Sequence, residues 1–208
     1  MRPSRILVVE DDVLVARAFE RQVSRIRPCV LTPTAEGAYD ALTKNDRWSG
    51  FVIDFMLEGD TGLDVAARVR ERYPETPIVI VTAHYGRRDV VNAASRLDCR
   101  LVAKPHVPRD LVGFLLDVVA YDLRQHDPEL ARAVRRIAKR ARLSPKESAV
   151  LACCMLFESR KDVLQALGVK EQTLKTLGRR MRDKLGVDSL EAARNLVVLE
   201  TESVRAGH

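Results

Sequence analysis

The first 121 residues alternate between short apolar runs and longer amphipathic stretches, and this alternation limits the fold more than any other feature. The runs are rich in β-branched residues and closed by polar or turn residues, as expected of strands buried on both faces. The sequence predicts strands at Arg5–Val9, Cys29–Thr32, Phe51–Asp54, Ile78–Thr82 and Leu101–Ala103. The other stretches predict helices at Val13–Ile26, Ala35–Lys44, Leu63–Tyr73, Arg87–Arg96 and Pro108–Tyr121. Strands that alternate with helices in this way form an α/β fold with a parallel sheet.

The strand pattern ends near Asp122, and the rest of the chain predicts helices. Pro128–Arg142 predicts a basic amphipathic helix, whose apolar side can pair with a second copy of the chain or pack against its own domain. Ser144 and Glu147 have the spacing of a capping box at the start of the next helix. Helices are predicted at about 145–157, 160–167, 171–185 and 189–200. We therefore divide the chain into an α/β domain at 1–121, a helical linker at 122–142 and an all-α domain at 143–208.

The net charge of +6 is confined to one part of the chain. Residues 1–121 contain 17 basic and 17 acidic residues, whereas residues 122–208 contain 18 basic and 12 acidic ones. Such asymmetry favours a basic module for nucleic acid beside a neutral one, with an ordinary solvated surface as the alternative.

Several classes of protein do not fit the sequence. No apolar run approaches the roughly 18 residues of a membrane span, and the apolar stretch at the start is too short for a signal peptide. We therefore expect a cytoplasmic protein. The four cysteines lack metal-ligand spacing and are expected to be small buried residues. The sequence shows no nucleophile–base pair and no glycine-rich phosphate loop that would indicate an independent enzyme.

Polar side chains follow four of the predicted strands. They are Glu10, Asp11, Asp54, Thr82 and Lys104. Because ligands of parallel sheets bind beyond the carboxyl ends of the strands, these side chains are expected to converge. The carboxylates suit a hard cation such as Mg²⁺, which would relieve their repulsion. The same groups suit phosphoryl transfer, with Asp54 as nucleophile while Lys104 and Thr82 contact the phosphoryl oxygens.

About residues 4–121 resemble the receiver domain of two-component response regulators. The resemblance rests on Glu10-Asp11, Asp54, Gly62 in "DTGLDV", Thr82 and Lys104-Pro105. It implies a flavodoxin-like (βα)5 fold and phosphorylation of Asp54 by a partner sensor histidine kinase with Mg²⁺. It also implies that Asp11 binds the metal directly, that Glu10 acts largely through water, and that the Met56 backbone carbonyl completes the protein ligands. Asp12 is then a helix-start residue.

Three positions depart from the receiver pattern. Glu58 stands where the family usually has proline, and Leu101 stands where many receivers carry a switching aromatic ring. His84, two residues after Thr82, occupies a variable position that can tune loss of the phosphoryl group, although a lone surface histidine is the simpler interpretation. These departures leave phosphorylation chemically possible and put the usual relay from it in doubt.

The predicted helix at 171–185 is rich in cations. Six basic residues and two acidic ones lie between Lys170 and Lys184. Lys175 and Arg179 share a face with Thr176 and Arg182 beside it, and the opposite face is apolar. This pattern matches a recognition helix for the major groove, and an ordinary amphipathic helix is the alternative.

About residues 143–200 resemble the LuxR-type (NarL-like) helix-turn-helix. The resemblance rests on "LSPKE", "TLKT", "RRMRDKLGV" and "SLEAA". It implies that Lys175, Thr176 and Arg179 face base edges and that Arg180 and Lys170 contact phosphates, with Arg182 beside them. Gly178 lies inside this helix and is a deviation, because glycine costs about 1 kcal/mol of helix stability relative to alanine.

These features predict a DNA-binding transcriptional response regulator that binds promoter DNA as a homodimer once Asp54 is phosphorylated. Two alternatives remain. The first is a phosphorylation-independent regulator that uses the receiver only as a dimerisation platform. The second is a protein-interaction adaptor whose basic part binds an acidic partner.

Overall fold

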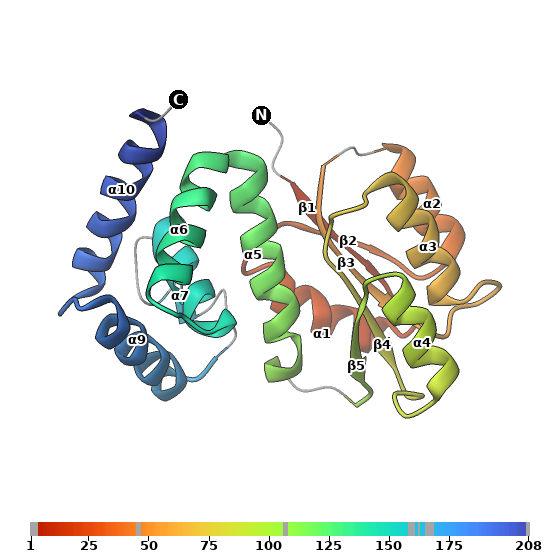
Figure 1. Cartoon of the computed structure of the whole chain (residues 1–208). Helices are drawn as coiled ribbons and strands as arrows, with labels where there is room; N and C mark the ends of the chain where they lie inside the picture. The colour runs from red at the N-terminus through yellow and green to blue at the C-terminus, as the bar shows by residue number, and fades with distance from the viewer. Residues whose placement is uncertain are drawn as a thin grey trace. The chain divides into compact units, whose positions relative to one another are not determined.

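The computed structural model describes residues 4–44, 47–105, 108–157, 161, 163–164 and 169–206 (Figure 1). The chain divides into two compact units, with the boundary between Val118 and Val119. None of the described helices combines the length and the apolar composition needed to cross a membrane.

The first unit is built on a five-stranded sheet with the order β2-β1-β3-β4-β5, and every neighbouring pair is parallel. The strands are β1 (Arg5–Val9), β2 (Cys29–Thr32), β3 (Trp48–Asp54), β4 (Ile78–Thr82) and β5 (Arg100–Ala103). The chain runs outward from β1 to β2 and then crosses back to β3. The strand order therefore reverses between β1 and β3, which is where such sheets bind ligands.

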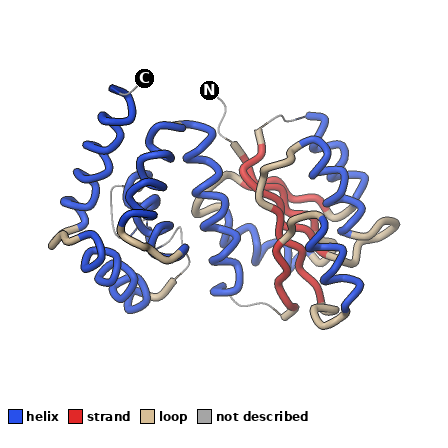
Figure 2. Tube along the Cα trace, in the orientation of Figure 1, coloured by secondary structure: helices blue, strands red, loops and turns tan. Residues whose placement is uncertain are grey.

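Helices cover both faces of this sheet, as Figures 1 and 2 show. They are α1 (Val13–Val23), α2 (Ala35–Lys44), α3 (Gly62–Arg72), α4 (Arg88–Arg96) and the start of α5 (Val112–His126). The α2, α3 and α4 helices bury their apolar sides against alternate residues of β1, β3 and β4 in one core cluster. The α1 and α5 helices lie on the other face, where Phe19 and Phe114 are fully buried. The α/β fold predicted from the alternation is confirmed.

The predicted ends differ from the observed ones at a few elements. The β3 strand begins at Trp48, before the predicted Phe51, because Trp48 and Ser49 are buried and the Ser49 hydroxyl forms a 2.6 Å hydrogen bond with the Ser4 hydroxyl. The segment after β5 begins with a 3-10 turn, η1 (Pro108–Leu111), and only then continues as α5.

The described residues of the second unit beyond α5 are helical. The helices are α6 (Pro128–Arg140), α7 (Pro145–Leu156), α9 (Glu171–Leu185) and α10 (Leu190–Ala206). The predicted helix at 160–167 and Gly168 lie largely outside the described residues.

The α6 helix packs inside the second unit, against α10 and α7. Its apolar stripe, which includes Val134 and Ile137, is buried there. Arg140 and Arg205 add ion pairs with Glu200 and Glu129, at 3.1 and 3.0 Å. Of the two possibilities open from the sequence, the structure therefore shows packing against its own domain.

A buried acid joins α7 to α9. The Glu147 carboxylate accepts a hydrogen bond from the Ser144 N–H at 2.7 Å, which completes the predicted capping box, and another from the Lys184 ammonium at 2.6 Å. Lys184 also donates to the Arg142 carbonyl at 3.2 Å. Burial alone would raise the pKa of Glu147, but the hydrogen bonds from Lys184 and Ser144 lower it below its usual value. The two elements are thereby fixed to each other through one carboxylate.

Replacing Glu147 with glutamine is expected to destabilise the second unit by about 1–3 kcal/mol, because a buried charge-assisted hydrogen bond is lost. Urea denaturation followed by circular dichroism would measure the change. Arg205→Gln, which breaks the exposed ion pairs of Arg205 with Glu129 and Asp127, is the control and should cost less than about 1 kcal/mol.

The effect of Glu147→Gln should also depend on pH. Because the folded-state pKa is lowered, the stabilisation is complete above the ordinary value of 4.5 and is lost as the pH falls through the folded value. The difference between wild type and variant should therefore shrink in acid, and a difference that stays constant would contradict the assignment.

Candidate functional sites

Acidic side chains from two strand ends meet at the carboxyl edge of the sheet. Glu10 and Asp11 follow β1, and Asp54 ends β3. Each of the three offers a carboxylate oxygen, and these oxygens lie within 4.8 Å of one another. Glu10 and Asp54 are buried, whereas Asp11 is exposed. The convergence predicted from the sequence is therefore present for all three acids.

The Lys104 ammonium lies between two of these acids. Its nitrogen is 2.9 Å from an oxygen of Asp54 and 2.9 Å from an oxygen of Glu10. Lys104 follows β5, and its backbone N–H donates to the Thr82 carbonyl at 2.9 Å, which continues the pairing between β4 and β5. The Lys104–Pro105 peptide bond is cis. A residue far away in the chain is thus brought to the acids by the order of the strands.

Burial and mutual repulsion shape the protonation of the site. Burial raises the pKa of Asp54 and of Glu10, and the hydrogen bonds from Lys104 act against this rise. For Lys104, burial would lower the pKa, but the Asp54 and Glu10 carboxylates outweigh burial and raise it. One ammonium group thus contacts two carboxylates of a cluster of three, and the site has an excess of negative charge when all three are ionised.

This donor set fits a hard divalent cation. Mg²⁺ prefers oxygen ligands and binds through one or two carboxylates together with water. The Asp11 and Asp54 carboxylates are neighbours in the cluster, and Asp11 is open to solvent. An ion there would also offset the repulsion that Lys104 leaves uncompensated.

Gly62 allows the loop after β3 to close over Asp54. A Cβ atom at this position would lie 2.0 Å from the Asp54 carbonyl oxygen, so no other residue fits without moving the strand. The Gly62 N–H donates to the Phe55 carbonyl at 2.8 Å. Met56 pairs with Thr61 across the loop, and the Met56 N–H donates to the Asp54 carboxylate. The backbone of Met56 is therefore held beside the acid.

Thr82 ends β4, the neighbour of β3, and is 1% exposed. Its hydroxyl oxygen accepts a hydrogen bond from the His84 N–H at 2.9 Å, so the hydroxyl proton is available to another acceptor. The His84 ring meets Phe55 edge-on, with the ring centroids 5.9 Å apart. His84 is thus half-buried against the site rather than a lone surface residue.

The other singled-out positions of the first unit are not among the clustered acids. Glu58 is exposed and does not belong to the acidic cluster. Leu101 is partly buried against the apolar core of the sheet. Asp12 caps α1 by accepting hydrogen bonds from the N–H groups of Leu14 and Val15, at 2.8 and 3.1 Å. The interpretation of Asp12 as a helix-start residue agrees with this geometry.

The cations of α9 lie in different surroundings. Lys175, Arg179 and Arg180 are exposed, as is Lys170 at the start of the helix. The neutral Thr176 is exposed beside them. Lys175 and Arg179 also form ion pairs along the helix with Glu171 and Asp183, at 3.4 and 3.8 Å.

Two cations of α9 are engaged differently. Arg182 is half-buried and lines a cavity, so it lies at the border of the buried face rather than beside the exposed one. Lys184 is bound to Glu147. Sequence reasoning missed this pair because the partners lie 37 residues apart, and only the packing of α9 on α7 brings them together.

A parallel sheet of this order defines a doubly wound α/β protein, and its carboxylates and lysine gather at the edge where such sheets bind ligands. Residues 6–115 match the response regulator receiver domain family. This match spans more than half of the chain, and the chain belongs to that family.

Individual relatives agree with this assignment. A chemotaxis protein CheY homolog of Campylobacter jejuni is 28% identical over 119 residues, which cover 55% of this chain and 92% of the relative. The alginate biosynthesis transcriptional regulatory protein AlgB of Pseudomonas syringae is 31% identical over 107 residues, 51% of this chain but 24% of AlgB. Among solved structures, the response regulator StyR has a TM-score of 0.50 and 20% identity, with coverage of 94% of this chain and 98% of StyR. The likeness to StyR shows similarity of fold.

Adding Mg²⁺ is expected to stabilise the first unit. At a tenfold excess over the dissociation constant, one bound ion contributes about 1.4 kcal/mol, which a thermal shift assay detects. Asp54→Asn and Asp11→Asn should abolish the stabilisation, because each removes a carboxylate from the cluster.

Asp12→Asn is the matched control, since it removes a charge from the same turn while asparagine still caps the helix. Its response to Mg²⁺ should equal that of the wild type. Loss of the response in Asp12→Asn, or its persistence in Asp54→Asn, would show that the ion binds elsewhere.

Proposed function

We propose that this chain is a DNA-binding transcriptional response regulator, phosphorylated on Asp54 by a sensor histidine kinase with Mg²⁺. Membership of the receiver family supports phosphorylation on aspartate in two-component signalling. The observation that carries the proposal for this chain is the Lys104 ammonium, 2.9 Å from both Asp54 and Glu10, beside an acidic cluster. The regulator would act in the cytoplasm, on promoter DNA.

The residues of the site have separate roles in this proposal. The Asp54 carboxylate attacks the phosphoryl group carried by the histidine of the kinase. The bond between phosphorus and the histidine nitrogen breaks as the new bond to the Asp54 oxygen forms. Lys104 then pairs with a phosphoryl oxygen, and Thr82 donates the proton that His84 leaves free.

Mg²⁺ would be held by Asp11, Asp54 and the Met56 backbone carbonyl, with Glu10 acting through water. When bound, the ion offsets negative charge on the phosphoryl oxygens. Glu10 and Lys104 hold each other in place, because the Glu10 side chain is fully buried and the lysine is its charged partner. In this role the site accepts the phosphoryl group and retains it, and no other reaction is required of it.

The second unit would carry the DNA-binding surface on α9. Lys175, Thr176 and Arg179 would face base edges, while Lys170 and Arg180 would contact phosphates, and Arg182 would act at the border of this surface. Their exposure on one helix and the basic charge of residues 122–208 support this assignment. Phosphorylation would favour a homodimer that binds two half-sites about one helical turn apart.

A second candidate is a phosphorylation-independent regulator or adaptor that uses the receiver only as a dimerisation platform. The specific observation in its favour is Leu101, which packs partly buried against the core and has no ring to rotate. Beryllofluoride with Mg²⁺ separates the two candidates, since only the phosphorylated regulator should change its oligomeric state or DNA affinity.

Asp54→Asn is expected to abolish incorporation of phosphate from acetyl phosphate, because the amide is not a nucleophile. Intact-mass spectrometry would show the added phosphoryl group in the wild type alone. Glu58→Gln, an exposed carboxylate in the same loop, is the control and should be labelled like the wild type. Labelling of Asp54→Asn would refute Asp54 as the acceptor.

The double variant Lys175→Ala and Arg179→Ala is expected to lose about 1–3 kcal/mol of sequence-specific binding for each base contact removed. Genomic selection would first supply the DNA sequence, and fluorescence anisotropy would then give the affinity. The pair Arg135→Ala and Lys139→Ala, exposed on α6, removes the same charge and should leave specificity unchanged. Equal losses in both double variants would mean that α9 does not read bases.

A further inference from the structure

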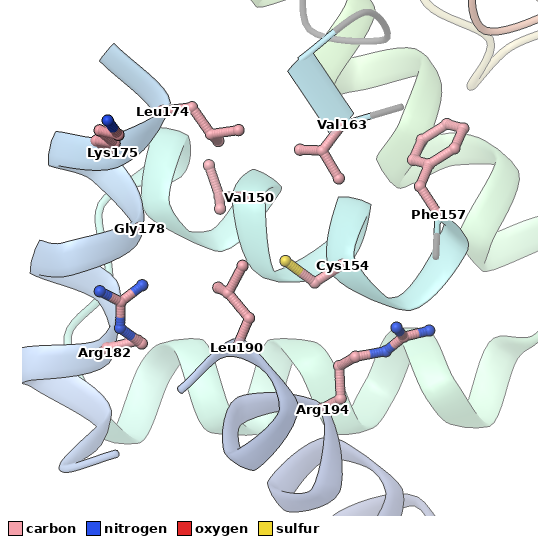
Figure 3. A pocket seen from close by; sticks show the side chains of 10 residues that line it. All are labelled: Val150, Cys154, Phe157, Val163, Leu174, Lys175, Gly178, Arg182, Leu190 and Arg194. Carbon is pink, nitrogen blue, oxygen red and sulfur yellow. The ribbon is translucent and has the colours of Figure 1, made fainter. Parts of the chain in front are cut away.

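A cavity of about 120 Å³ lies within the second unit, between α7, α9 and α10 (Figure 3). Its wall is mostly apolar and is made by Val150, Cys154, Phe157, Val163, Leu174 and Leu190. Figure 3 shows Val163, Leu174 and Leu190 pointing toward its middle, with the Cys154 sulfur beside them. A cavity of about 150 Å³ with an apolar lining is known to hold a benzene molecule, so this space suits a group of about that size.

Three cations line the same cavity. They are Lys175 and Arg182 from α9, and Arg194 from α10. Among the described residues, Arg182 and Arg194 form no ion pair, although both are half-buried. Burial raises the pKa of the Cys154 thiol, and the positive charges of Arg194 and Arg182 act in the opposite direction. Their potential therefore reaches the apolar wall.

Gly178 leaves one wall of the cavity open. This residue is buried in the middle of α9, and a Cβ atom there would have only ordinary contact with the Arg182 guanidinium, at 3.6 Å. Neither backbone geometry nor tight packing therefore requires glycine here. Its missing side chain contributes space beside the Arg182 guanidinium.

We propose that this cavity is a binding site for a small carboxylate with an aromatic or branched apolar group. The apolar part would fill the space between Val150, Leu174 and Leu190, and the carboxylate would pair with Arg182, whose guanidinium lies beside Gly178 and on the opposite side of this space from that of Arg194 (Figure 3). A neutral apolar molecule would leave Arg182 half-buried with no ion pair among the described residues, and an inorganic anion would leave the apolar wall empty. The site goes beyond the proposed function, and DNA is left out of its test so that the result does not depend on α9 being a recognition helix.

The test is an NMR titration of the ¹⁵N-labelled full chain with benzoate, and with benzamide as its neutral counterpart. We expect saturable shift changes that cluster at residues lining the cavity. Benzamide should bind roughly tenfold more weakly, because it lacks the charge that pairs with Arg182.

Variants then locate the site. Gly178→Leu places a side chain in the cavity and should abolish benzoate binding, while Arg182→Gln should weaken it roughly tenfold and leave benzamide unaffected. Arg135→Gln, exposed on α6, removes the same charge elsewhere in the unit and should have no effect.

Absence of saturable shifts, equal affinity for benzoate and benzamide, or unchanged benzoate binding in Arg182→Gln would each overturn the proposal. If Gly178→Leu does not fold, Arg182→Gln alone decides, because it changes a half-buried side chain and leaves the apolar wall intact.

Discussion

The Lys104 ammonium holds together the carboxyl edge of the sheet. Glu10 and Asp54 end neighbouring strands and are both buried, so without a cation between them their charges would raise each other's pKa and favour protonation. Lys104 reaches both at 2.9 Å because β5 pairs with β4 in the register that continues from Thr82 into the lysine. The acidic site therefore depends on four strands, β1, β3, β4 and β5, keeping their register. Lys104 compensates one negative charge of the cluster. The remaining negative charge favours binding of a divalent cation.

Another buried carboxylate, that of Glu147, differs from those of Glu10 and Asp54. It accepts hydrogen bonds from the Ser144 backbone and from Lys184, and its pKa is lowered rather than raised. The charge of Glu147 is compensated by these two partners. Glu147 therefore fixes the start of α7 to the end of α9 and leaves no uncompensated charge for a ligand. Burial raises the pKa of Asp54 and acts in the same direction on Glu147. The hydrogen bonds that each carboxylate accepts decide whether its pKa ends above or below the usual value, and this distinguishes a structural carboxylate from a reactive one.

The sequence predicted the five strands and the three acids because both depend on local pattern. Strands buried on both faces are continuous apolar runs, and polar residues after such runs must meet at the carboxyl edge of a parallel sheet. It did not predict the start of β3 at Trp48, since burial of Ser49 depends on a hydrogen bond to Ser4, 45 residues away. It also treated Arg182 and Lys184 as parts of one cationic series. Their separate surroundings come from the packing of α9 on α7 and α10, which no spacing within α9 reveals.

Gly178 links this packing to the energetics of α9. A glycine in the middle of a helix costs about 1 kcal/mol relative to alanine, and alanine would fit at this position without a clash. The helix is nevertheless continuous through Glu171–Leu185, because Leu174 and Met181 are buried on the same side and anchor it. Tertiary packing thus offsets a local penalty, and the residue that carries this penalty is the one whose missing side chain opens the cavity. The same helix therefore presents cations to solvent on one side and a partly charged, unfilled space on the other.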